Sequence, residues 1–179
     1  MEIWRRLQTE QAAWALRNFG VRQLHWPLLG IVEELGELDD ALGSTANLET
    51  EAHQYREGII DAMADTLIFT MDFCTGHKWW LQDLLDNRVL RDLDATERGR
   101  GFLSLVGELC HAQLKQEQGI RGSIAEHDAK MQLLVVRIFT KIERMALRHD
   151  INLAVETANI WDTIVSKRDF TKNKQTGVV

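Results

Sequence analysis

Residues 30–38 read GIVEELGEL, and residues 101–109 read GFLSLVGEL. The two stretches share a glycine at the first and seventh positions, followed by Glu-Leu, and Ala41 recurs as Ala112 at the same offset. The same offset also sets residues 61–65 against residues 132–136, so both the motif and the loop length repeat. Similarity at a fixed offset indicates a repeated structural unit, whereas the alternative is a chance likeness of two amphipathic helices. We expect duplication, with repeat one at about 20–92 and repeat two at about 96–168.

Helix is the expected structure throughout the chain. Its 179 residues contain a single proline, Pro27, so little interrupts helix formation. Apolar residues such as Ile59, Met63 and Leu67 follow helical spacing, and no segment alternates as a strand would. The predicted class is all-α, a helical bundle in one domain over residues 1–170, with a polar tail at 171–179. The predicted helices are 2–18, 28–43, 52–74, 78–92, 96–117, 124–148 and 151–168.

Bulk properties narrow the classes of partner. The formal net charge of -6 does not favour a nucleic-acid partner. No apolar run approaches the roughly 18 residues of a membrane span, and the N-terminus has no apolar signal region. Cys74 and Cys110 stand in no metal-binding spacing, which is typical of reduced core thiols. We therefore expect a cytoplasmic protein without a membrane or nucleic-acid partner.

Two acidic pairs carry the strongest functional signal. Glu34 and Glu37 are three residues apart and Asp61 and Asp65 four apart, so each pair shares one face of its helix. Asp65 falls within an apolar stripe, where a lone carboxylate is costly. If the two helices pack antiparallel, the carboxylates converge and repel by roughly 1–4 kcal/mol per pair. Oxygen ligands select hard ions, so we expect Mg²⁺, with Mn²⁺ as the alternative. The competing interpretation is a solvated acidic face beside an N-terminal cap.

The second repeat lacks this acidic set. Opposite Glu33, Glu34, Asp61 and Asp65 it carries Ser104, Leu105, Gln132 and Val136. Only Glu108 remains, opposite Glu37. We interpret repeat two as a degenerate copy that keeps the packing and has lost the metal. Glu108 and His111 form one Glu-x-x-His pair, but a ferritin-like di-iron bundle needs two, so that alternative is weaker.

The acidic motifs resemble those of a known superfamily. EELGE at 33–37, followed by DAMAD at 61–65, is similar to the all-α nucleoside triphosphate pyrophosphohydrolases, which include MazG-like proteins, dimeric dUTPases and phosphoribosyl-ATP pyrophosphohydrolase. HWPLLG at 25–30 and KRDF at 167–170 make the likeness to MazG-like proteins more specific, and it covers most of residues 18–170. The family pattern, EExxE and then ExxD, would place glutamate at position 62, where this chain has Ala62. Asp61 is the substitute that we expect.

The resemblance implies a MazG-like bundle that hydrolyses a nucleoside triphosphate to the monophosphate and pyrophosphate with Mg²⁺. Glu34, Glu37, Asp61 and Asp65 would bind the metal, and Glu33, Glu34 and Glu37 would form the catalytic set, with Glu33 orienting the attacking water. Lys167 and Arg168 would bind phosphate, and Asn18, Trp26, Asn159 and Trp161 would contact the base. Single-copy relatives dimerise, so duplication leaves a monomer and a homodimer both open. The main alternative is a non-catalytic regulatory or assembly module of the same fold.

Overall fold

The computed structural model describes residues 3–43, 49–87, 89–90 and 101–171, and these residues form an all-α protein with no strand. Within them are seven α-helices and one short 3-10 helix, η1. In chain order they are α1 (Ile3–Phe19), α2 (Trp26–Gly43), α3 (Glu49–Gly76), α4 (Leu81–Asp86), α6 (Phe102–Gln118), α7 (Ile124–Arg148), α8 (Leu153–Thr163) and η1 (Val165–Lys167). The prediction that the chain is all-α is confirmed for the described residues.

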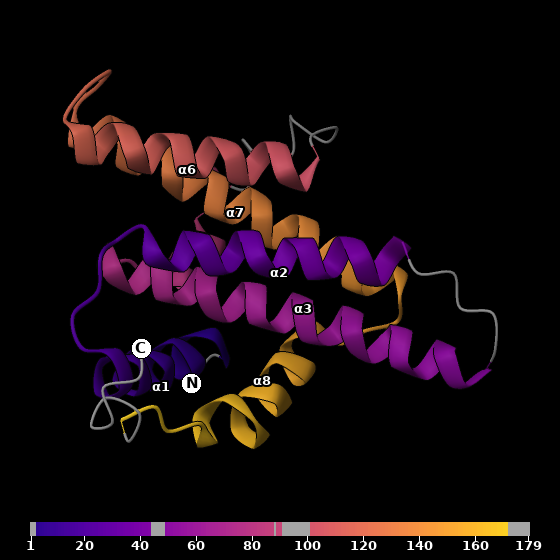
Figure 1. Cartoon of the computed structure of the whole chain (residues 1–179). Helices are drawn as coiled ribbons and strands as arrows, with labels where there is room; N and C mark the ends of the chain where they lie inside the picture. The colour runs from indigo at the N-terminus through magenta and orange to yellow at the C-terminus, as the bar shows by residue number, and fades with distance from the viewer. Residues whose placement is uncertain (1–2, 44–48, 88, 91–100, 172–179) are drawn as a thin grey trace.

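The helices α2 and α3 form the centre of the molecule. They run side by side, α6 and α7 form a second pair across one side of them, and α1 and α8 lie on the other side (Figure 1). Helix α3 contacts α1, α2, α7 and α8, which makes it the central element of the fold. Any polar side chain on α3 therefore needs a partner from a neighbouring helix or a route to solvent.

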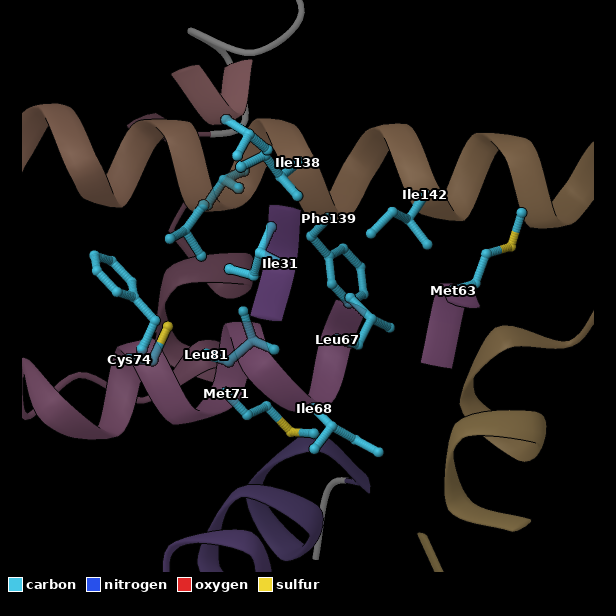
Figure 2. Packing of buried hydrophobic residues seen from close by; sticks show 14 of the residues in the cluster. Ile31, Met63, Leu67, Ile68, Met71, Cys74, Leu81, Ile138, Phe139 and Ile142 are labelled. Carbon is cyan, nitrogen blue, oxygen red and sulfur yellow. The ribbon is translucent and has the colours of Figure 1, made fainter. Parts of the chain in front are cut away.

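The hydrophobic core fills the space between these layers. Ile138, Phe139 and Ile142 of α7 point toward Ile31 of α2 and Leu67 of α3 (Figure 2). All five side chains are buried, and the ring of Phe139 also meets Trp4 of α1 edge-on at 5.3 Å. Burying a side chain of this size contributes about 1.5–3 kcal/mol, so the core fixes how α2 and α3 are held.

One glycine sets the distance between α2 and α3. A Cβ atom at Gly30 would lie 2.5 Å from two atoms of the Phe69 ring, so any side chain there would force Phe69 to move. Gly36, two turns further along α2, has no atom within 4 Å of its own Cβ position. The close approach at Gly30 keeps the acidic segment of α2 near α3.

Helix boundaries match the prediction where capping signals are present. The bounds of α7 agree with the predicted 124–148, and the helix begins with a capping box formed by Ser123 and Glu126. The predicted start of the fourth helix at residue 78 is wrong, because Lys78 has a positive φ of 62° that interrupts helix there. Helix α4 begins at Leu81, whose backbone N–H donates to the Gln8 side chain of α1 at 2.9 Å. The predicted helix at 151–168 ends earlier, at Thr163, and continues as η1.

Some predictions concern residues outside the described part of the chain. They are the loop at 44–48, the helical residues 91–92 and 96–100, and the tail at 172–179. Among the described residues, no helix is long and apolar enough to cross a membrane.

Candidate acidic site between α2 and α3

Glu34 is an acidic residue on the buried face of α2. It is only 8% exposed, and it lies on the same face as Ile31 and Leu38, which are also buried. Glu33 and Glu37 flank this face and are exposed. The EELGE segment of α2 therefore presents one buried carboxylate, that of Glu34, and two exposed ones.

Helix α3 supplies the opposing acids. Asp65 is partly buried and Asp61, one turn earlier, is exposed, while Ala62 and Ala64 between them are buried. Small side chains at these two positions leave room for the neighbouring helices. The juxtaposition that the spacing suggested is present, because the carboxylates of Asp61 and Asp65 both act electrostatically on Glu34.

The carboxylates disfavour one another's ionisation. Burial is the main cause that raises the pKa of Glu34, to about 8, and the neighbouring charges of Asp65, Glu37, Glu33 and Asp61 add to it. Burial likewise raises the pKa of Asp65, to about 6, with a contribution from Asp61. Both helices thus hold a carboxyl group whose negative charge lacks compensation.

A third aspartate on α3 shows what compensation looks like. Asp72 is 4% exposed, and it accepts two hydrogen bonds from the guanidinium of Arg22, at 2.5 and 2.6 Å. Asp65 and Glu34 form no hydrogen bond or close ion pair with any residue that the structure describes. Unlike Asp72, these two carboxyl groups are therefore not paired with a basic side chain at hydrogen-bond distance among the described residues.

A divalent cation fits the chemistry of these donors, although the donors are not gathered around one point. Within the described residues, no three Asp, Glu, His or Cys side chains stand close enough to share an ion. Glu37 and Asp61 are exposed, so their side chains can rotate. The donor set is all carboxylate oxygen, which suits Mg²⁺ or Mn²⁺ better than zinc.

Arg168 brings positive charge to the edge of the site. Its guanidinium lies close enough to lower the pKa of Asp65, against the larger effect of burial. The backbone C=O of Arg168 accepts a hydrogen bond from the Trp14 indole at 3.0 Å, and the N–H of Phe170 donates to Asn18 at 2.8 Å. Phe170 also stacks on Phe19 at 5.5 Å. The backbone of the segment after α8 is thus held on α1, while the side chain of Arg168 is exposed.

The placement of Asn18 and Trp161 does not support base contacts. Asn18 is fully buried, and its amide also donates to the backbone C=O of Trp14 at 3.0 Å. Trp161 is 2% exposed and donates its indole N–H to Glu10 at 2.8 Å. Both side chains serve packing between α1 and the C-terminal part of the chain. Their polar atoms are already occupied.

The other predicted substrate-binding residues are open to solvent. Trp26 is 50% exposed at the first position of α2. Asn159 is exposed on α8, and Lys167 is exposed at the end of η1, next to Arg168. On α6, Glu108 is partly buried, with a carboxylate oxygen 3.9 Å from the ammonium of Lys130, and His111 is exposed.

A groove beside the acidic site was missed by sequence reasoning. It lies between α3 and α8, has a volume of about 530 Å³, and is lined by Arg56, Ile60, Asp61, Glu156, Ile160 and Ile164, among others. Asp61 belongs to both the groove and the acidic site. No sequence pattern pairs these two helix faces, because the pairing depends on how α8 packs on α3.

Comparisons with protein-family models, with curated proteins and with solved structures found no match for this chain.

Proposed function

We propose that this chain is a Mg²⁺-dependent nucleoside triphosphate pyrophosphohydrolase with a MazG-like, internally duplicated fold. The observation that carries the proposal is the packing of α2 against α3, which brings the buried carboxylate of Glu34 beside Asp65. The likeness of EELGE and DAMAD to the superfamily motifs supports the reaction class.

In the proposed reaction, the oxygen of a water molecule attacks the α-phosphorus, the bond from this phosphorus to the bridging oxygen breaks, and pyrophosphate leaves. Glu34, Glu37, Asp61 and Asp65 would hold Mg²⁺, which neutralises the triphosphate and makes a bound water more acidic. Such an ion would also compensate Glu34 and Asp65, whose raised pKa values reflect burial and the charges of neighbouring carboxylates.

The remaining steps belong to the chain's own residues. Glu33 is exposed at the edge of the acidic set and would accept the proton of the attacking water. Arg168, whose guanidinium acts electrostatically on Asp65, would bind the phosphates that leave, and Lys167 beside it in the chain would add charge. Repeat two would supply packing without a metal site.

Pyrophosphate release from a panel of ribo- and deoxynucleoside triphosphates tests the proposal, with Mg²⁺ and with EDTA, and with orthophosphate assayed separately. The repeat offers a matched pair of variants, because Glu37→Gln and Glu108→Gln make the same change at equivalent positions. We expect Glu37→Gln to lose turnover and Glu108→Gln to keep it. Equal turnover in the two variants would contradict the assignment of Glu37 to the site. Release of orthophosphate without pyrophosphate would mean that water attacks a phosphorus other than the α-phosphorus.

The competing function is a non-catalytic module of the same fold. Ala62, which is buried where the superfamily pattern has glutamate, favours it. Stabilisation of the protein by Mg²⁺ without pyrophosphate release from any nucleotide would establish this alternative.

A further inference from the structure

The groove between α3 and α8 adjoins the acidic site at one residue, Asp61. Asp61 is the shared residue, since it lines the groove and acts electrostatically on both Glu34 and Asp65. A molecule whose charged end lies at Asp65 can therefore extend past Asp61 into the groove. A volume of about 530 Å³ lies within the usual range of small-molecule sites, roughly 300–1,000 Å³.

Charge is distributed unevenly along this path. At the Asp65 end, Arg168 supplies a guanidinium and Lys167 is its neighbour. At the groove end the only cation among the lining residues is Arg56, which donates to the backbone C=O groups of His149 and Asp150 at 2.5 and 2.9 Å. The groove lining carries the carboxylates of Glu57, Asp61 and Glu156, so phosphates are favoured at the Arg168 end and disfavoured in the groove, where a group without negative charge fits.

The groove walls suit a flat, hydrogen-bonding ring. Ile60, Ile160 and Ile164 provide apolar surface from both helices, and Ile164 is 46% exposed. Glu156 adds a carboxylate that has no hydrogen-bond or ion-pair partner among the described residues. An ionised carboxylate only accepts hydrogen bonds, so it recognises an amino group and rejects a carbonyl oxygen.

We propose that this groove binds the nucleoside part of the substrate and that Glu156 selects bases with an exocyclic amino group. The inference rests on the proposed function for the identity of the substrate as a nucleotide. It adds a binding site and a specificity-determining residue. Cytosine and uracil are the sharpest pair for testing it, because they differ at position 4, where one has an amino group and the other a carbonyl oxygen.

A second hollow is less suited to the same role. It has a volume of about 400 Å³, lies between α2, α6 and α7, and is lined largely by apolar residues such as Val32, Phe102 and Leu103. None of Glu34, Glu37, Asp61 and Asp65 lines it, so a base there has no direct path to the acidic site.

Binding of free nucleosides tests the groove without any metal or turnover. Saturation-transfer NMR would compare deoxycytidine with deoxyuridine on the wild type and on Ile164→Trp, whose indole fills the groove. Val155→Trp is the matched control, because Val155 lies on α8 outside the groove lining and is 49% exposed, close to the 46% of Ile164. We expect deoxycytidine to bind the wild type and Val155→Trp, and to lose at least fivefold in signal on Ile164→Trp. Equal signals on Ile164→Trp and the wild type, no signal on the wild type, or equal or stronger deoxyuridine binding would overturn the proposal.

Hydrolysis then tests the role of Glu156. We expect Glu156→Ala to lower the ratio of kcat/KM for dCTP over dUTP by roughly tenfold, since a hydrogen bond to a charged group is lost. Glu156→Gln keeps a hydrogen-bond acceptor and gains a donor, so its ratio of kcat/KM for dCTP over dUTP should fall between those of the wild type and Glu156→Ala. An unchanged ratio in Glu156→Ala would overturn the specificity role. Deoxycytidine binding without pyrophosphate release from any nucleotide would instead refute the proposed function and leave the groove standing.

Discussion

Replacing Glu34 with glutamine should stabilise the metal-free protein while removing its response to Mg²⁺. The pKa of Glu34 is raised from 4.5 to about 8, so the folded protein resists ionisation of this carboxyl and the unfolded chain does not. The contribution of the neutral Glu34 carboxyl to the stability of the folded protein is fully present below pH 4.5 and is lost progressively as the pH rises to about 8. Glutamine has nearly the same shape and never ionises, so it keeps that stability at high pH.

The magnitude follows from the difference between the two pKa values. At 1.36 kcal/mol per pKa unit, the full cost of ionisation is about 5 kcal/mol above pH 8. Solvent reaches the site from the side of the exposed Glu37 and Asp61, so screening leaves roughly 2–3 kcal/mol. For a chain of this length, that corresponds to an increase in Tm of roughly 5–10 °C at pH 9.

Thermal and urea unfolding of the two proteins in EDTA at pH 6 and pH 9 measures the effect. We expect the advantage of Glu34→Gln to grow between these pH values, and we expect Mg²⁺ to stabilise only the wild type. Glu33→Gln is the control, because it removes the same charge from the adjacent exposed position. Parallel pH profiles for Glu34→Gln and the wild type would refute the assignment of an uncompensated buried carboxyl.

Three further predictions concern packing, metal and phosphate. Gly30→Ala should destabilise the protein by about 1–2 kcal/mol, because overpacking against Phe69 exceeds the gain in helix propensity. Gly36→Ala, which meets no neighbouring atom, should stabilise it by about 0.5–1 kcal/mol. Urea unfolding measures both free energies, and equal effects of the two substitutions would contradict the close approach at Gly30. Asp65→Asn should abolish the Mg²⁺-dependent rise in Tm, and an unchanged rise would exclude Asp65 as a ligand. Arg168→Gln should raise the pKa of Asp65 further, which NMR titration would follow, and an unaltered titration would show that the guanidinium does not act on Asp65. If Arg168 binds phosphate, the same substitution should lower kcat/KM for nucleoside triphosphates roughly tenfold or more.

Helix class and the acidic pairs were predictable because both depend on local spacing. A three- or four-residue interval places two carboxylates on one helix face whatever the neighbours are, so Glu34 and Asp65 could be singled out. The bounds of α7 were equally accessible, since Ser123 and Glu126 form a local capping signal. The start of α4 could not be predicted from the sequence, because no local signal marks the left-handed conformation of Lys78.

The rest of the site depends on contacts between distant segments. Nothing near Asn18 indicates that its side chain holds the backbone of Phe170, so a buried structural amide was predicted to contact a base. The groove at Glu156 likewise arises only when α8 packs on α3. Spacing within one helix predicts which side chains share a face, but which faces meet is decided by the packing of the whole core.

The fixed segment after α8 has a consequence for how the protein is made. Asp65 leaves the ribosome long before Arg168, so the acids of α2 and α3 are synthesised before their neighbouring guanidinium exists. Until Phe170 docks on Asn18 and Phe19, the nascent chain carries its carboxyl groups without that charge. Free Mg²⁺ in the surroundings can screen them during this interval, so synthesis at low magnesium should leave more of the chain incompletely folded.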